Sequence, residues 1–371
     1  MAGSIYEPTS GALSRTPILC KVEDPDPVVR FELSIKVWRG DVASVPATAT
    51  YFLIKYPDES NGATFDISQL LQSEFESDYQ TFSVFDDNTN QVIWVQCNYV
   101  IVGLSTNQNI AGVPFIVYDG YGEFIEGVNA VAPIVASSQT QELLLNESSA
   151  YTLALNQAGL PYSIETINVV FDIGGSTDIA NIKLNLDISE YNLLYTDVSP
   201  SVFTGLYDKS YVLNVINTNT DTIAVINVEV ECEPKFTPVT IAFINKNGAW
   251  DYLTFSKARK EMIDVESSEF MPYILGSTFG NAPSYSATTS QIKRYDINAN
   301  ESITLNTTFL PESYYETIKQ LMMSNECVWV ERGLSLNPKT MNMMKKISVN
   351  KEMIQYTVDF SHASLTQSTV R

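Results

Sequence analysis

Asp119 and Glu123 are the residues whose types and spacing best suit catalysis. They lie in the segment VYDGYGEF, beside the aromatic residues Tyr118, Tyr121 and Phe124. A glycosidase uses two carboxylates that flank the scissile bond, so the two acids would have to face each other across a cleft. Spacing along the chain does not establish this, and a glycine-rich aromatic loop suits a contact between subunits equally well. A glycosidase is therefore the third of three candidate functions.

His362 is the single histidine of the chain, nine residues before the C-terminal residue in the polar segment SHASLTQSTVR. Nucleophilic catalysis by serine or cysteine needs a base that is held by packing and by a further partner. A flexible polar tail does not provide that support, so we expect His362 to be an incidental surface residue. A single histidine also argues against a histidine-rich zinc site.

Three polar segments look like ligand-binding loops but are interpreted as turns. Residues 86–90 (DDNTN) begin like a calcium loop, yet Gln91 stands where glycine is needed and Cys97 where the bidentate glutamate is needed. Residues 217–221 (NTNTD) are interpreted in the same way. Residues 174–177 (GGST) follow an apolar strand but lack the lysine of a phosphate-binding loop. We predict no catalytic residue, no metal site and no cofactor.

Lys257, Arg259 and Lys260 form the one tight basic cluster, in the segment TFSKARKE. The cluster has two interpretations. It is either a docking patch for an acidic face of a neighbouring subunit or a solvated turn, in which single surface ion pairs contribute little.

The formal net charge of −21 is concentrated in the N-terminal two thirds of the chain. Residues 1–235 contain 30 Asp and Glu against 9 Lys and Arg, whereas residues 236–371 contain 13 of each. The 127 residues from 56 to 182 contain no Lys or Arg. Because nucleic-acid binding depends on basic side chains that neutralise phosphates, such a surface disfavours it. The acid suits either a wall past which DNA slides without sticking or a solvated surface that aids solubility.

The cysteines and the N-terminal residues indicate a reduced, soluble protein made in the cytoplasm. Cys20, Cys97, Cys232 and Cys327 have no close spacing, which favours free buried thiols over a metal site or a disulfide framework. The first 14 residues lack the basic and apolar regions of a signal peptide, and no apolar run approaches the length of a membrane span.

The hydrophobic pattern predicts a mainly β, multi-domain protein. Residues 1–16 are interpreted as an arm that orders against a neighbouring subunit. Residues 17–136 are predicted to form an Ig-like β-sandwich and residues 137–233 a second sandwich. In Val28–Trp38 the apolar side chains Val29, Phe31, Leu33, Ile35 and Val37 alternate with polar ones. Strands of the second sandwich are expected at 142–145, 151–155, 163–173, 179–188, 209–216 and 223–231.

Residues 234–371 are predicted to form a third β domain with one helix. A hairpin is expected from Val239–Ile244 to Trp250–Phe255, with its turn at residues 245–248. The helix is expected at about 311–324, with Pro311 at its first position and Tyr314, Tyr315, Ile318, Leu321 and Met322 on one face. A last hairpin is expected from residues 343–349 to residues 353–360.

Three stretches of this third segment carry a family resemblance: PVTIAFINKNGAWDYLTFSKARKEMIDVESSEFM, ESITLNTTFLPESYYETIKQLMMSNECVWVE and KISVNKEMIQYTVDF. They resemble virion structural proteins of crAss-like short-tailed bacteriophages of Bacteroidetes, and residues 17–71 resemble these proteins more weakly. The resemblance implies Ig-like modules, a C-terminal tail-tube-like β domain, and a place in the virion tail as a ring, hub or tube around the DNA-ejection channel. It transfers no functional residues.

The partners that the resemblance implies are copies of the chain itself, neighbouring tail or portal-adjacent virion proteins, and genomic DNA that passes without specific binding. No membrane insertion is expected. The second candidate function is a carbohydrate-binding, adhesive module of a tail fibre, which the 20 tyrosines suggest.

Overall fold

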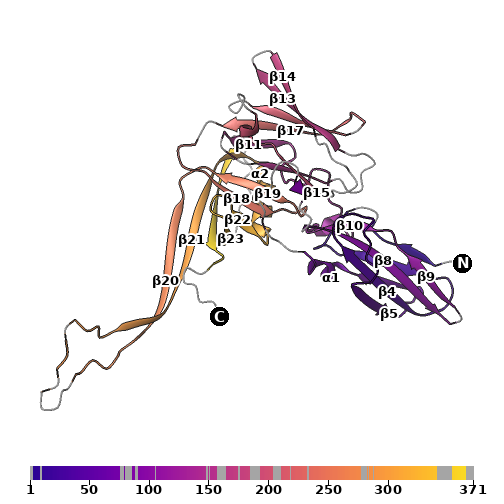
Figure 1. Cartoon of the computed structure of the whole chain (residues 1–371), viewed down its shortest axis with the longest axis horizontal. Coiled ribbons are helices and arrows are strands. Elements are labelled where there is room, and N and C mark those ends of the chain that lie inside the picture. Colours follow the sequence, from indigo (N-terminus) through magenta and orange to yellow (C-terminus); the bar gives the residue numbers. More distant parts are fainter. Residues whose placement is uncertain are drawn as a thin grey trace.

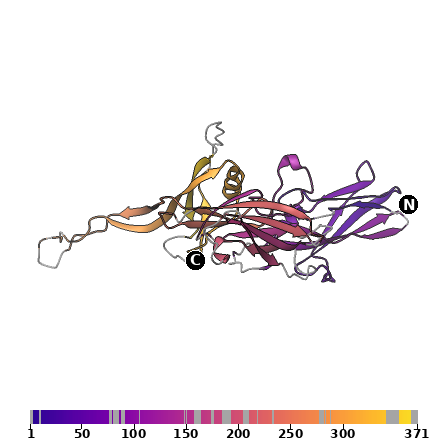
Figure 2. The same cartoon turned by 90° about the horizontal axis from the view of Figure 1, so that it is seen from above.

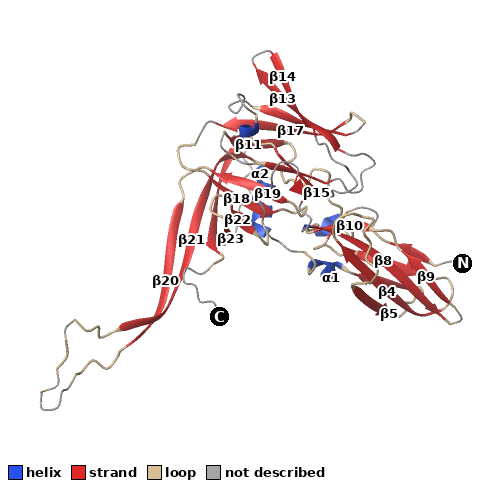
Figure 3. Ribbon diagram, in the orientation of Figure 1, coloured by secondary structure: helices blue, strands red, loops and turns tan. Residues whose placement is uncertain are grey.

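A computed structural model describes the chain except residues 1–2, 9–10, 76–78, 80–85, 88–90, 105, 148, 150, 157–163, 174–175, 184–192, 204–209, 218, 232–233, 277–281, 283, 287, 341–352 and 365–371. The described residues form five β-sheets and two α-helices, which confirms the predicted mainly β class (Figure 3). None of the described helices is long and apolar enough to cross a membrane.

Two sheets pack face to face at the N-terminal end of the chain (Figure 1). A core of apolar side chains from both sheets, including Cys20, Phe65, Leu33 and Val95, lies between them. The sheets have the orders β1-β3-β6 and β2-β10-β8-β4-β5, with β9 paired to β8. Their strands are β1 (Ser4–Tyr6), β2 (Ala12–Leu13), β3 (Leu19–Glu23), β4 (Val28–Trp38), β5 (Tyr51–Lys55), β6 (Gly62–Asp66), β8 (Val92–Gly103), β9 (Asn107–Ala111) and β10 (Phe115–Tyr118).

The predicted strand β4 is confirmed, with one difference at its start. Phe31, Leu33 and Ile35 are buried as expected, but the side chain of Val29 is 40% exposed. A register shift against β8 between Val28 and Arg30 explains the difference, because a bulge turns the residue at that point away from the core.

The segment before residue 17 belongs to the sandwich, which corrects the expectation of an arm ordered by a neighbour. β1 pairs with β3, and β2 pairs in parallel with β10. Ala12 and Leu13 are buried. The small residues of this segment suggested that it would be disordered on its own. Gly11 instead lies against the ring of Tyr118, and its lack of a side chain allows this close contact.

Three of the four cysteines are free and buried, as predicted, and Cys232 lies outside the described residues. The Sγ atoms of Cys20 and Cys97 approach to 3.9 Å between the two facing sheets. Burial raises the pKa of the Cys327 thiol to about 12.

The middle of the chain contributes a five-stranded sheet, β11-β17-β16-β13-β14, and a three-stranded sheet, β12-β15-β7. Strands lie at all six expected positions, but the one expected at 179–188 begins at Ser176 and is described only to Lys183; β15 is an additional strand. The turn at residues 217–221 is confirmed as well, because the side-chain Oδ1 of Asn217 accepts the backbone N–H groups of Asn219 and Asp221. The strands are β7 (Asp86–Asp87), β11 (Glu142–Asn146), β12 (Thr152–Asn156), β13 (Ile164–Ile173), β14 (Ser176–Lys183), β15 (Leu193–Asp197), β16 (Tyr211–Asn217) and β17 (Thr222–Glu231).

A seven-stranded sheet with the order β19-β18-β22-β23-β24-β21-β20 forms the C-terminal part. Residues 343–349 of the expected last hairpin lie outside the described residues, and its second limb is β24. The elements are β18 (Val239–Ile244), β19 (Trp250–Phe255), β20 (Lys260–Phe270), β21 (Lys293–Pro311), α2 (Tyr314–Met323), β22 (Cys327–Trp329), β23 (Leu334–Pro338) and β24 (Met353–His362); the short helix α1 (Ser68–Gln72) follows β6.

Helix α2 is shorter than predicted. Pro311 is the last residue of β21 rather than the first of the helix, and Ser313 is the N-cap residue. The predicted apolar face is largely confirmed, since Tyr314, Ile318 and Leu321 are buried. Proline suits a strand end as well as a helix start, so its position alone did not distinguish the two.

The hairpin β18–β19 lies between two hydrophobic cores. Its turn is as predicted, with Gly248 at φ 80°. One face packs Trp250 and Tyr252 into a core shared with the N-terminal and middle sheets. The other face packs Leu253 and Phe255 into a core with α2 and the rest of the C-terminal sheet. Both faces of β19 are therefore covered.

Candidate assembly surfaces

A long two-stranded arm leaves the C-terminal sheet and extends away from the rest of the chain (Figures 1 and 2). It consists of the edge strand β20 and the first half of the 19-residue strand β21. The second half of β21 pairs with β24 within the sheet. Since one continuous strand runs through both parts, the arm is a direct extension of the sheet.

The arm carries apolar side chains that the described elements leave about half exposed. Met262, Ile263 and Val265 are 49%, 55% and 47% exposed. Val265 pairs directly with Ala299, and opposite residues of an antiparallel pair share a face. Two steps along that face Ile263 stands opposite Glu301, and the next pair joins Glu261 to Ile303, which is 1% exposed. This face of the arm therefore continues the core-facing side of the sheet beyond the point where the core ends, with two acids among its apolar residues.

The outer part of the arm is rich in exposed aromatic residues. Phe270 and Tyr295 pack edge to face with ring centroids 5.6 Å apart. Tyr273 and Tyr285 are 86% and 68% exposed. Monomeric proteins rarely expose contiguous apolar surface of this kind, and such surface marks interaction sites. The arm is therefore the leading candidate for a contact with another molecule.

The predicted basic cluster lies at the base of the arm, where it contacts aromatic rings and an acid of its own chain. Arg259 and Arg332 lie over the ring of Trp329, at 5.5 and 4.0 Å from its centroid. Arg259 also pairs with Glu261 at 3.0 Å. Lys257 lies 6.0 Å from the centroid of another ring. These contacts favour a role in anchoring the arm over a free docking patch.

Asp119, the first of the two candidate catalytic acids, is buried in an ion pair with a residue 104 positions away. Both of its oxygens accept hydrogen bonds from the Arg15 guanidinium at 2.9 Å, and the Ser14 hydroxyl donates to Oδ1 at 3.4 Å. The following residue, Gly120, meets the β18–β19 turn so closely that a Cβ atom there would lie 2.4 Å from the Lys246 carbonyl oxygen. The carboxylate thus fixes the loop where it meets the central hairpin.

Glu123, the second candidate acid, is held by a different cation. The ammonium of Lys319 on α2 donates to it at 2.7 Å, and this hydrogen bond lowers the pKa of Glu123. Three residues on, Glu126 pairs with Lys246 at 2.5 Å. A lowered pKa means that the stabilising contribution of Glu123 is present above its usual pKa of 4.5 and is lost as the pH falls through the lowered value. The structure therefore gives each acid its own structural partner.

The same loop exposes a small apolar tip. Residues 124–126 form a 3₁₀ helix in which Phe124 is 100% and Ile125 is 87% exposed. Of the two interpretations that the sequence left open for this loop, this geometry favours a contact between subunits. It is a second candidate assembly surface.

We expect the purified protein to release no reducing sugar from host capsular polysaccharide. Asp119→Asn is expected to lower the free energy of unfolding by about 1–3 kcal/mol, because it leaves the Arg15 guanidinium without its charged partner. Glu123→Gln is expected to cost less than about 1 kcal/mol, since that pair is exposed. Sugar release that both substitutions abolish would instead support a glycosidase.

The remaining candidate residues form no constellation for chemistry in the described part of the chain. His362 ends strand β24 instead of lying in a flexible tail, and its Nδ1 is 3.5 Å from Glu301 Oε2. Of the predicted turns, residues 174–175 and 88–90 lie outside the described residues, whereas Asp86–Asp87 form β7 and Ser176 begins β14, so the described ends of both turns are strand. No group of three His, Cys, Asp or Glu residues suited to a metal ion occurs among the described residues.

No family model and no curated protein matches the chain. Among solved structures, the periplasmic chaperone SfaE is 10% identical over 62% of this chain and 100% of its own, with a TM-score of 0.20. The sialic acid binding region of a Streptococcus sanguinis SK1 adhesin, bound to 3'sLn, is 11% identical over 64% of this chain and 80% of its own, with a TM-score of 0.14. Such scores identify no family and carry no argument about function.

Proposed function

We propose that this chain is a structural component of a bacteriophage tail, in which its copies form a ring around the DNA-ejection channel. The observation that carries the proposal is the β20–β21 arm. An extended hairpin with an uncovered apolar face cannot stabilise itself, because an isolated two-stranded sheet is marginal in water. A neighbouring molecule that covers this face would remove it from water and so stabilise the hairpin.

The complementary surface lies on the N-terminal sandwich, at the opposite end of the chain (Figure 1). Its edge strand β5 exposes Phe52 and Ile54 at 74% and 61%, and the adjacent Tyr56 is 77% exposed. Strand β20 and strand β5 are both edges, so each has unpaired backbone groups available for strand addition.

Charge supports the same pairing. Strand β20 contains four acids and one base, in the segment KEMIDVESSEF. Positions 15–55, which include the strands around β5, contain six Lys and Arg against five Asp and Glu, so they lack the excess of acid found in residues 56–182. Two different surfaces at opposite ends of one chain produce head-to-tail contacts, and such contacts close into a ring when the rotation allows it.

The acidic N-terminal two thirds suit a channel wall, because like charge keeps the DNA backbone from adhering. Replacing several channel-facing Asp and Glu residues with Lys is expected to leave assembly intact and to slow DNA ejection. Screening acts over about 8 Å at physiological salt, so the slowing should be greatest at low salt. An assembled structure in which the acids of residues 56–182 all face away from the passage would refute this role of the charge.

Adhesion to a carbohydrate is the second candidate, and the exposed Tyr273 and Tyr285 at the outer part of the arm favour it, because sugar rings pack on aromatic faces. Glycan binding that is lost in the Tyr273→Ala and Tyr285→Ala variants, by a protein that stays monomeric, would support adhesion over assembly.

The assembly proposal is tested by sedimentation of the purified chain over a range of concentrations, alone and with other tail proteins. We expect a discrete oligomer of fixed size. A monomer under all these conditions, together with absence of the chain from purified particles, would refute the proposed function.

A further inference from the structure

The loop at the outer end of the arm contains no charged residue. Strands β20 and β21 pair as far as Phe270 and Lys293. Residues 270–292 include no Asp, Glu, Lys, Arg or His, although the chain as a whole has 18% charged residues. The arm holds this loop away from the sheets (Figures 1 and 2). Charged side chains are normally found on surfaces that face water, so their absence here needs a physical reason.

Burial in a core does not explain the missing charge. Residues 88–118 are also uncharged, but they include β8 and β10, whose side chains are buried or half-buried. In the loop, apolar and aromatic side chains are instead 46–86% exposed. Five of them form what we name the outer-loop surface: Met271, Tyr273, Leu275, Tyr285 and Ile292.

The described backbone of the loop includes a hairpin pairing beyond the end of β20. Gly276 and Ser284 exchange two backbone hydrogen bonds, of 2.9 and 3.0 Å. This pairing places Leu275 opposite Tyr285, so the two side chains share a face. The six residues from Met271 to Gly276 reach at most about 20 Å when extended. The loop is therefore long enough for its surface to leave water while the stem of the arm stays in it.

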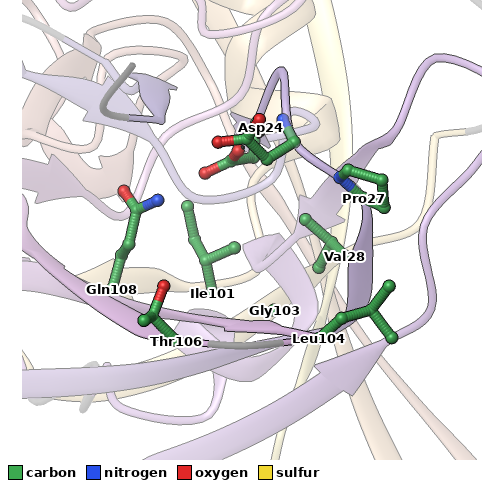
Figure 4. Close-up of a pocket in the computed structure, with 9 residues that line it drawn as sticks. Asp24, Pro27, Val28, Ile101, Gly103, Leu104, Thr106 and Gln108 are labelled. Atoms are coloured by element: carbon green, nitrogen blue, oxygen red, sulfur yellow. Dashed lines mark hydrogen bonds between the residues drawn. The ribbon is translucent and has the colours of Figure 1, made fainter.

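Acids stand beside three other exposed apolar surfaces of the chain. The 3₁₀ helix at residues 124–126 has Glu123 as its N-cap and Glu126 as its last residue. A cavity of about 300 Å³ in the N-terminal sandwich has Leu104 on its wall, but Asp24 and Asp26 also line it (Figure 4). The apolar face at the base of the arm includes two acids. The outer-loop surface differs from these three because its segment contains no ionisable acid or base.

We propose that the outer-loop surface binds to a lipid bilayer, at the boundary between the headgroups and the acyl chains. An ionised side chain that enters a bilayer is costly, so a loop that enters it must lack charge. Tyrosine suits this boundary, because its ring is apolar while its hydroxyl stays hydrated. A protein partner would be oriented by complementary charges, and the loop offers none, which favours lipid.

The proposed contact is interfacial and spans nothing. Backbone groups need partners within the hydrocarbon, and Gly276 with Ser284 is the one ladder pairing described between the limbs of the loop. Charges resume at the stem, where Glu269 stands opposite Arg294. The surface therefore lies at headgroup depth, with the stem in water. This revises, for this loop alone, the expectation of no membrane insertion, and it does not depend on the ring.

The test is cosedimentation of the full chain with unilamellar vesicles of pure synthetic phosphatidylcholine. We expect saturable binding that persists at high salt, because burial of apolar surface drives it and charge does not. These vesicles carry no sugar and no protein. A chain that does not bind them, or that binds only after a glycolipid or a protein receptor is added, would overturn the proposal.

A charge placed in the outer-loop surface should prevent this binding. Tyr273 is 86% exposed, so Tyr273→Asp should leave the melting temperature unchanged and weaken vesicle binding at least about tenfold. Val131→Asp adds the same charge to an apolar side chain of the N-terminal sandwich that is 54% exposed, and it is the matched control. Equal vesicle binding by the two variants would show that the loop is not the contact.

The depth of the contact is measured with Tyr273→Trp. Trp38, Trp250 and Trp329 are at most 8% exposed, so their emission provides a constant baseline. We expect the emission of the new indole to shift to shorter wavelength with vesicles. Lipids brominated near the headgroup should quench it more than lipids brominated near the chain end. No shift on binding, or stronger quenching by the deeper bromines, would contradict an interfacial contact.

Discussion

The double substitution Ile263→Asp and Val265→Asp is expected to abolish assembly and to leave the monomer folded. Both side chains are about half exposed, at 55% and 47%, so in the monomer the change should alter the free energy of unfolding by less than about 0.5 kcal/mol per site. In an interface the same carboxylates would be buried without partners. A buried, unpaired polar group costs several kcal/mol, so the dissociation constant should rise by at least about 100-fold.

A matched control exists on the opposite face of the arm. Asn298 and Asn300 pair with Glu266 and Asp264, and the register places them away from Ile263 and Val265. Asn298→Asp and Asn300→Asp add the same charge to the same strand pair. Sedimentation velocity should show oligomers for this control and monomers for the first variant, with equal melting temperatures. Equal assembly of the two variants would contradict the role of the apolar face.

The second large effect is expected at Asp251, in the hairpin between the two cores. This carboxylate is 1% exposed. It accepts hydrogen bonds from the Ser138 backbone N–H at 2.6 Å, the Tyr151 hydroxyl at 3.2 Å and the Asn245 side-chain amide at 3.4 Å. Burial and the nearby charge of Asp251 raise the pKa of Tyr151, so this hydroxyl keeps its proton and remains a donor.

Asp251→Ala is expected to lower the free energy of unfolding by about 3–5 kcal/mol, because several buried donors lose their acceptor at once. Asp251→Asn keeps one oxygen and should cost less. Asp264→Ala on the exposed arm is the control and should stay within about 0.5 kcal/mol. Denaturant unfolding measures the free energy of unfolding of all three variants. If Asp251→Ala lowers it no more than Asp264→Ala does, the hydrogen bonds of Asp251 do not hold the parts of the chain together.

The local elements of this fold were predictable because their signals are local. Alternation identified β4, the turn with Gly248 identified the central hairpin, and the period of apolar residues identified α2. The arm was not predictable in this way. The apolar residues of β20 lie on both faces of the strand, since Met262 and Ile263 are neighbours, and whether a further layer covers a strand depends on the rest of the fold.

The contacts of the candidate site residues also could not be predicted from local sequence patterns. Asp119 and Glu123 were candidates for a glycosidase pair, but the residues that bind them, Arg15 and Lys319, lie 104 and 196 positions away. A useful signal for the arm was the segment GSTFGNAPSYSATTSQ between its strands, which is long and poor in aliphatic residues.

Electron microscopy of the assembled protein tests the central claim most directly. We expect closed rings in which the arm of each copy lies on the N-terminal sandwich of the next, with β20 beside β5 and a central passage wide enough for DNA. Particles that contain single copies, or oligomers in which every arm projects into solvent, would contradict the account.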